Sequence, residues 1–85
     1  MESHMARVKV YTTSYCPYCV RAKQLLSSKG IDFEEVNMDG KTDELKALKE
    51  KTGLQTVPQI FIDDELVGGF TELAAKDSRG ELQGL

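Results

Sequence analysis

The chain has 85 residues, of which 40% are hydrophobic and 29% are charged, and its formal net charge is −3. A chain of this size and composition forms one small globular domain. Because the acidity is mild and dispersed, and no apolar run approaches the roughly 18 residues of a membrane span, we expect neither nucleic-acid nor membrane binding. We expect a cytoplasmic location, where thiols stay reduced.

The first four residues, Met-Glu-Ser-His, read as the remnant of an expression tag, because Met5 offers a second start. We therefore predict a single domain over residues 5–85. The only histidine, His4, falls in the remnant.

The first predicted elements are a strand and a helix. Arg7–Thr12 is rich in β-branched residues and predicts a strand. Pro17 follows Cys16 and favours the start of a helix, since proline suits the first helical position. Apolar residues then recur at helical spacing to about Lys29, and Gly30 is a natural C-terminal stop.

A second strand and helix follow. Ile31–Asn37 predicts a weaker strand. Thr42 or Asp43 can cap a helix that directs its leucines inward and its lysines outward and ends near Gly53.

The last part of the chain predicts a hairpin and a helix. Gln59–Ile62 and Glu65–Val67 read as two short strands, joined by a two-residue turn at residues 63–64. Thr71 can cap a final helix through about Lys76, followed by a short tail without assigned structure.

The order of elements is βαβ followed by αββα. The first unit implies two parallel strands with a right-handed crossover, and the hairpin adds antiparallel strands. We therefore predict an α/β fold in which helices cover both faces of a small mixed sheet.

A Cys-x-x-Cys sequence lies at the predicted start of the first helix. Unpaired backbone N–H groups and the helix dipole stabilise an anion there, so the pKa of the Cys16 thiol should lie well below that of a free cysteine. Cys19 lies on the same helical face and can close a reversible disulfide with Cys16. Since Cys19 is deeper in the first turn, we predict that Cys16 attacks and that Cys19 is the resolving thiol.

Two other interpretations of the cysteine pair stay open. The pair could be half of a zinc site, but the remaining ligands are missing, and we predict no metal. Two inert core cysteines are also known in proteins, although the strand-to-helix context disfavours them here.

Three segments together resemble the dithiol glutaredoxin family: the active-site sequence Cys16–Cys19, the segment Thr56–Phe61 (TVPQIF), and the glycine-pair segment Gly68–Leu73 (GGFTEL). They occur in the family's order and spacing. The resemblance implies a thioredoxin fold, with a four-stranded mixed sheet flanked by about three helices and a cis peptide bond at Pro58.

The resemblance also implies a glutathione site. The Val57 backbone would pair with the bound tripeptide, and Tyr18 would flank the thiolate. Glu72 could accept a hydrogen bond from the ligand's ammonium group. The residues carried over as glutathione-binding are Tyr18, Gln55, Thr56, Val57, Pro58, Gly69, Thr71 and Glu72.

Two positions depart from the family pattern. Many glutaredoxins have a lysine where this chain has Thr13, and many have a third cysteine where it has Phe70. Lys23, on the first helix, is expected to be a solvated surface charge.

The implied activity is a glutathione-dependent thiol–disulfide oxidoreductase, with glutathione as cosubstrate and no tightly bound cofactor. Its implied substrates are glutathionylated or disulfide-bonded proteins, with ribonucleotide reductase as one candidate, and a monomer is expected. One rival is a redoxin recharged by thioredoxin reductase. Another is an iron–sulfur carrier that bridges a cluster between two subunits, which Pro17 disfavours by stiffening the site.

Overall fold

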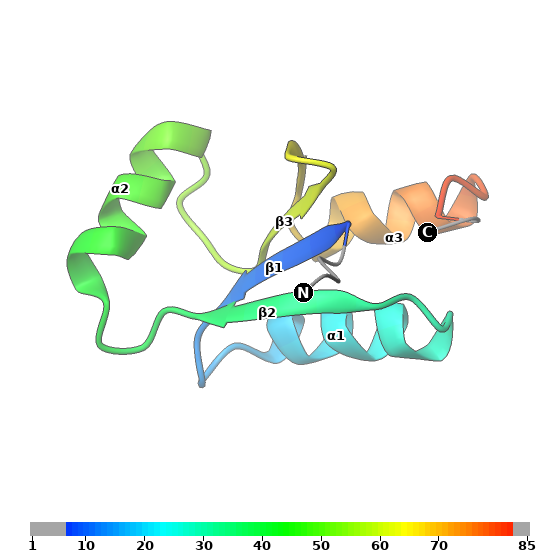
Figure 1. Cartoon of the computed structure of the whole chain (residues 1–85), viewed down its shortest axis with the longest axis horizontal. Coiled ribbons are helices and arrows are strands. Elements are labelled where there is room, and N and C mark those ends of the chain that lie inside the picture. Colours follow the sequence, from blue (N-terminus) through cyan, green and yellow to red (C-terminus); the bar gives the residue numbers. More distant parts are fainter. Residues whose placement is uncertain (1–6, 83–85) are drawn as a thin grey trace, which may run out of the picture.

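The computed structural model describes residues 7–82 (Figure 1). The predicted tag remnant at residues 1–4 and the start at Met5 lie outside the described residues. The strands are β1 (Val8–Thr12), β2 (Phe33–Asn37), β3 (Gln59–Ile62) and β4 (Glu65–Gly68), and the helices are α1 (Pro17–Ser28), α2 (Thr42–Thr52) and α3 (Phe70–Ser78). Within this described range, no helix has the length and apolarity to cross a membrane.

The four strands form one mixed sheet in the order β2-β1-β3-β4. β1 pairs with β2 in parallel, as the predicted crossover requires, and with β3 antiparallel. The predicted hairpin of β3 and β4 is also present. The turn residues Asp63 and Asp64 both have positive φ, of 51° and 68°. Two successive residues with positive φ are typical of the two-residue hairpin turns whose twist matches that of the flanking strands.

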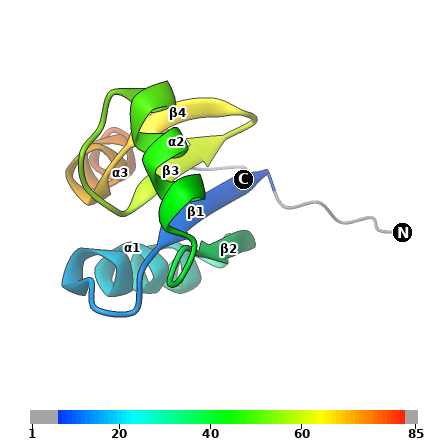
Figure 2. The same cartoon turned by 90° about the vertical axis from the view of Figure 1, so that its left-hand side faces the viewer.

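The core lies between the sheet and two helices. Val8, Val10 and Thr12 alternate along β1 with no exposed surface, and α1 and α3 pack together on this side of the sheet (Figures 1 and 2). The core cluster consists of Val8, Val10, Ala22, Leu26, Ile31, Ile60, Leu73 and Leu82. The core therefore includes Leu82, which belongs to the C-terminal tail for which the sequence predicted no structure.

The connection from α1 to β2 explains why β2 begins later than predicted. Gly30, with φ of 70°, donates its N–H to Ser27, and Ile31 donates to the carbonyl of Leu26 at 3.0 Å. This is the paired hydrogen-bond pattern that ends many helices, with an apolar contact between the two flanking residues. Ile31 is thus buried as part of the helix stop, and β2 starts at Phe33.

Helix α2 contributes less to the core than predicted. It has no buried residue, its leucines Leu45 and Leu48 are half-buried, and it stands where β1 and β2 end (Figures 1 and 2). We predicted that helices cover both faces of the sheet, but α1 and α3 lie on one face and α2 does not cover the other. The predicted caps Thr42 and Asp43 are wrong, because Lys41 occupies the cap position without a side-chain hydrogen bond.

The cap of helix α3 lies two residues before the cap predicted at Thr71. Gly69 is the cap residue, and its backbone N–H donates to the carboxylate of Glu72 at 2.8 Å. A side chain that reaches back to the cap N–H satisfies one of the groups that the helix cannot pair itself. Thr71 therefore lies inside the first turn.

Candidate active site

The two cysteines are joined by a disulfide at the start of α1, with their Cα atoms 5.1 Å apart. Cys16 is the cap residue of the helix and Pro17 its first residue. The backbone N–H of Cys19 donates to Cys16 Sγ at 3.0 Å, so the sulfur occupies the place of a capping oxygen. The exposed fraction is 9% for Cys16 and 1% for Cys19, so Cys16 is the more accessible residue of the pair.

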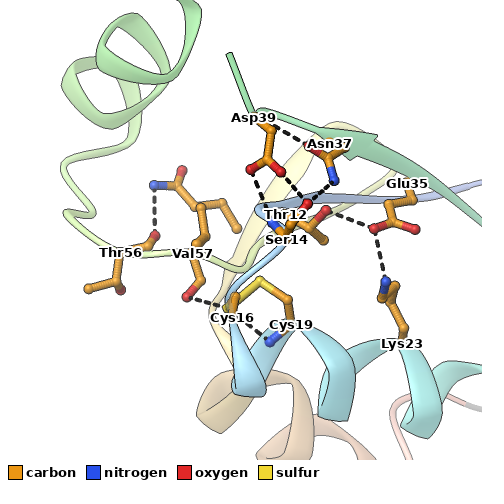
Figure 3. Close-up of a disulfide and its surroundings, with 11 residues drawn as sticks. Thr12, Ser14, Cys16, Cys19, Lys23, Glu35, Asn37, Asp39, Thr56 and Val57 are labelled. Carbon is orange, nitrogen blue, oxygen red and sulfur yellow. Dashed lines mark hydrogen bonds and ion pairs between the residues drawn. A yellow bond between two sulfur atoms is a disulfide. The ribbon is translucent and has the colours of Figure 1, made fainter. Parts of the chain in front are cut away.

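The segment before β3 faces this sulfur. The Val57–Pro58 peptide bond is cis, as predicted, and the Val57 carbonyl oxygen lies 3.5 Å from Cys16 Sγ (Figure 3). A thiol at position 16 in the reduced protein would have an acceptor there.

A cleft of about 490 Å³ lies beside the disulfide, between the segment before β3 and the start of α3. Its lining residues are Tyr18, Leu54, Thr56, Val57, Pro58, Gly69, Phe70, Thr71 and Glu72. Seven of the eight residues predicted to bind glutathione are among them. The eighth, Gln55, is exposed and does not line the cleft, whereas Leu54 and Phe70 were not predicted.

Tyr18 is held between an aromatic ring and a cation. Its ring stacks on that of Phe70, with centroids 6.1 Å apart and planes inclined by 30°. The Arg21 guanidinium carbon lies 5.2 Å from the Tyr18 ring centroid, within the range of a cation–π contact. Phe70, which stands where many relatives have a cysteine, therefore supports a residue that lines the cleft.

Gln59 is a site-shaping residue that the sequence analysis missed. It is fully buried at the start of β3. Its amide nitrogen donates to the carbonyls of Leu54 and Thr56, each at 3.1 Å, and its oxygen accepts from the Thr52 hydroxyl at 2.8 Å. One side chain thus fixes the loop that forms one wall of the cleft. The available signal was a glutamine at an inward-facing position of an apolar strand.

Glu72 already has a partner in this structure. Its carboxylate accepts from the Gly69 N–H that begins α3. The carboxylate also crowds Gly68, where a Cβ atom would lie 2.8 Å from Glu72 Cγ. Glycine is therefore required at position 68 by the close approach of Glu72, whereas a Cβ at position 69 would make only ordinary contacts.

The loop before Cys16 is tied to the end of β2. Asp39 accepts hydrogen bonds from both the backbone N–H and the hydroxyl of Ser14, and Asn37 also contacts that hydroxyl. The Ser14 hydrogen bonds hold the pKa of the Asp39 carboxyl below its ordinary value. Thr13, the departure from the family pattern, lies half-buried in this loop.

Lys23 is not the solvated charge that the sequence suggested. Its ammonium donates to Glu35 Oε2 at 2.9 Å, and the side chains of both residues are 32% exposed. The hydroxyl of the buried Thr12 donates to the same oxygen at 2.8 Å. The hydrogen bonds from Lys23 and Thr12 hold the pKa of the Glu35 carboxyl below its ordinary value.

Comparisons with known proteins identify the family of this chain. The family model "Glutaredoxin" matches residues 8–67. Glutaredoxin 3 of Escherichia coli is 49% identical over 81 residues, covering 95% of this chain and 98% of the relative.

Two solved structures share the fold. Wheat glutaredoxin superposes with a TM-score of 0.86 at 38% identity, covering 91% of this chain and 76% of that one. A buckwheat glutaredoxin–glutathione complex superposes with a TM-score of 0.83 at 31% identity, covering 91% and 73%. With the cysteine pair at the start of α1, these matches show that the chain belongs to the glutaredoxin family of thiol–disulfide oxidoreductases, with Cys16 and Cys19 as its redox pair.

Proposed function

We propose that the protein uses glutathione to reduce protein–glutathione mixed disulfides and protein disulfides, with Cys16 as nucleophile and Cys19 as resolving thiol. The observation that carries this proposal is the position of Cys16 Sγ. It accepts the Cys19 N–H at the helix N-terminus, and it lies 3.5 Å from the carbonyl oxygen of Val57, a residue that lines an open cleft. Such a hydrogen bond and the helix dipole both favour the thiolate over the thiol.

The monothiol reaction has two exchanges. The Cys16 thiolate attacks the glutathionyl sulfur of a mixed disulfide, and the substrate protein leaves as its thiolate, which takes a proton from water. A second glutathione, as thiolate, then attacks the Cys16–glutathione disulfide. Oxidised glutathione is released and the Cys16 thiolate is restored, so two electrons from glutathione reduce one disulfide.

For a protein disulfide, the same attack leaves Cys16 bound to a substrate sulfur. Cys19, losing its proton, attacks Cys16 Sγ and releases the second substrate thiol. The closed Cys16–Cys19 disulfide is the state of this structure. Two glutathione molecules then reopen it and leave as oxidised glutathione.

Glutathione would lie in the cleft as a short extended peptide. The Val57 backbone, half-buried beside Cys16, offers main-chain groups of the kind that pair with an added strand. The first turn of α3, beyond the cap residue Gly69, offers the backbone N–H groups of Phe70 and Thr71 to the γ-glutamyl carboxylate. The buckwheat complex, which holds glutathione on the same fold, supports this placement.

Three more assignments depend on the details of the site. Glu72 would accept the ligand's ammonium on the carboxylate oxygens that the Gly69 N–H leaves available. Tyr18 would cover the glutathionyl sulfur. Thr56 lines the cleft and Gln55 lies exposed beside it, and these two would flank the glycine end of the ligand.

The protein would act as a monomeric domain of residues 5–85 in the cytoplasm, on glutathionylated or disulfide-bonded proteins, with ribonucleotide reductase as one candidate. Glutathione would be its cosubstrate, and the proposal requires neither a tightly bound cofactor nor a metal, nucleic acid or membrane. In the cytoplasm the glutathione pool keeps thiols reduced, so the supply of electrons is continuous.

A glutathione-coupled turnover assay tests the proposal. With a glutathionylated peptide as substrate, Cys16→Ser should abolish turnover, because no other thiolate can attack. Cys19→Ser should retain that reaction and lose most direct reduction of a protein disulfide, which needs the resolving thiol. If Cys19→Ser is as inactive as Cys16→Ser on the glutathionylated peptide, the assigned roles are wrong. If thioredoxin reductase but not glutathione restores the oxidised protein, the cosubstrate is wrong.

A further inference from the structure

One charged pair lies close to the redox centre but outside the cleft. Lys23 is on α1, four residues after Cys19, and residues at this spacing are neighbours on one helical face. Its ammonium reaches Glu35 on β2 at 2.9 Å. Figure 3 shows Lys23, Glu35 and Thr12 grouped on the side of the disulfide away from Val57.

The pair is anchored from three elements. Glu35 Oε2 accepts both the Lys23 ammonium and the hydroxyl of Thr12, the fully buried last residue of β1. Both donors are therefore directed at one oxygen, which fixes the carboxylate relative to the strand that leads into the cysteine loop. An ordinary surface ion pair has no such second anchor and contributes little.

The other charged groups near the disulfide are already engaged. Arg21 lies over the Tyr18 ring, Asp39 binds Ser14 in the preceding loop, and Glu72 binds the Gly69 N–H at α3. Lys23 and Glu35 are engaged with each other, and they lie on the Cys19 side of the redox pair (Figure 3).

We propose that Lys23 and Glu35 are a balanced pair of positioning residues at the redox centre: either charge alone would shift the reduction potential of the Cys16–Cys19 pair, and together their opposite charges nearly cancel at the thiolate. This rests on the proposed role of Cys16 as the thiolate. Reduction of the disulfide takes two electrons and one proton and yields the Cys16 thiolate and the Cys19 thiol. A nearby positive charge stabilises this reduced form and raises the potential, whereas a negative charge lowers it.

The size of the effect follows from Coulomb's law. For any single charge on the order of 8 Å from a thiolate, an effective dielectric of about 40 gives a change in thiolate stability of about fivefold. With both charges present, the two effects largely cancel. Removing either partner alone should therefore shift the potential in a direction set by the charge that stays.

The test uses Lys23→Met, Glu35→Gln and the double variant, each equilibrated with reduced and oxidised dithiothreitol. Dithiothreitol supplies the two electrons and closes to its own cyclic disulfide, so the measurement needs no glutathione site. Glu35→Gln should favour the dithiol about fivefold, and Lys23→Met should favour the disulfide about fivefold. The double variant should return to within about twofold of the parent, and the pH dependence of Cys16 alkylation should shift in parallel.

A matched control comes from the far end of the same helix. Lys29, the C-terminal cap residue of α1, is ten residues beyond Cys19 and pairs with Asp77 on α3 at 3.1 Å. Lys29→Met and Asp77→Asn also break one ion pair, but they should leave the dithiothreitol equilibrium within about twofold of the parent. Shifts of the same sign in Lys23→Met and Glu35→Gln, or shifts no larger than in these controls, would overturn the proposal. If the parent protein shows no glutathione-coupled turnover while the variants still show the predicted shifts in the dithiothreitol equilibrium, the result contradicts the proposed function and not this proposal.

Discussion

Two positions depart from the family pattern, and Thr13 is the one nearer to Cys16 in the sequence. The position lies three residues before Cys16 and half-buried in the loop that Asp39 ties to β2 through Ser14. The thiolate therefore depends on the helix N-terminus, the Cys19 N–H and more distant charges, without the ammonium that many relatives supply.

Replacing Thr13 by lysine should lower the pKa of the Cys16 thiol. An ammonium at about 6 Å and an effective dielectric of about 40 contributes about 1.4 kcal/mol, or about one pKa unit. Nucleophilicity falls with pKa along a slope of roughly 0.4–0.5, so an already ionised Cys16 would attack about threefold more slowly. We expect tighter glutathione binding and little gain in turnover at pH 7.

Thiolate absorbance followed against pH measures this shift, with Thr13→Met as the control of similar length and no charge. If Thr13→Lys and Thr13→Met titrate alike, position 13 does not face the thiolate.

Gln59 shows how a single buried amide can shape a ligand site. Replacing it by leucine keeps the approximate volume but removes three hydrogen bonds to the segment from Thr52 to Thr56. Since groups left without partners cost about 1–3 kcal/mol, we expect Gln59→Leu to lower the free energy of unfolding by about that amount. The apparent KM for a glutathionylated peptide should rise, because one wall of the cleft loosens.

Urea unfolding and steady-state kinetics test this together. Gln24→Leu, a change at an exposed position of α1, should leave the unfolding midpoint nearly unchanged. If the urea midpoint of Gln59→Leu equals that of the parent, the buried amide does not hold the loop.

The junction between β4 and α3 is the element-level feature that forms the second wall of the cleft. Gly68 ends β4 with φ of 126°, and Gly69 is the cap residue before α3. Glu72 lies over both residues, and its carboxylate pairs with the Gly69 N–H. The strand therefore turns into the helix within two residues, which places the first turn of α3 beside Tyr18.

Replacing Gly68 by alanine should therefore destabilise the protein for two reasons. The φ of 126° is one that L-residues rarely adopt, and the new Cβ would lie 2.8 Å from Glu72 Cγ. Residues held in such regions cost of the order of 1–3 kcal/mol, and displacing Glu72 also removes its hydrogen bond to Gly69. We expect a loss of about 2–4 kcal/mol in the free energy of unfolding.

Gly80→Ala separates these two causes. Gly80 has φ of 74° but no atom within 4 Å of an added Cβ, so it reports only the cost of backbone conformation. Gly68→Ala should lose clearly more stability than Gly80→Ala in denaturant unfolding. Equal losses would show that Glu72 moves aside freely.

At the scale of the whole molecule, several carboxylates are held ionised by cations or hydroxyls. Arg7 lowers the pKa of Asp63, Ser14 lowers that of Asp39, and Lys23 with Thr12 lowers that of Glu35. Hydrogen bonds from Arg79 and Lys76 lower the pKa of Glu81 to about 2. These groups lie along the sheet edge, the cysteine loop and the end of α3.

Stability should accordingly fall in acid. A carboxyl whose pKa is lower in the folded than in the unfolded state stabilises the fold above its unfolded pKa, and this contribution is lost as pH falls through the folded pKa. We expect the urea midpoint to be constant from about pH 7 to 5 and to decline from about pH 4.5 toward 2. The decline should be modest and smaller in high salt, because these pairs are solvent-exposed.

Glu81→Gln provides the internal control. It removes one of the titrating carboxylates, so the decline below about pH 4.5 should be shallower than in the parent. A midpoint that rises on acidification would contradict the assigned direction of these pKa shifts.

The sequence by itself determined the order of the elements, the parallel pairing of β1 with β2, the hairpin of β3 and β4, and the place of Cys16 at the start of α1; the pairing of β1 with β3 came from the structure. The features that the sequence determined depend on local signals: side-chain periodicity, proline at the first helical position, and glycine or aspartate where φ is positive. The family's motifs added the cis bond at Pro58 and most of the cleft lining.

Only the tertiary structure decided which distant side chains meet. Gln59 is buried against a loop that precedes it, Phe70 stacks on Tyr18, and Lys23 joins Glu35 and Thr12. Each contact unites groups from different elements, and the sheet's register, not local propensity, sets their separation. For the same reason the sequence placed Lys23 in solvent, since no local pattern shows which strand passes over a helix.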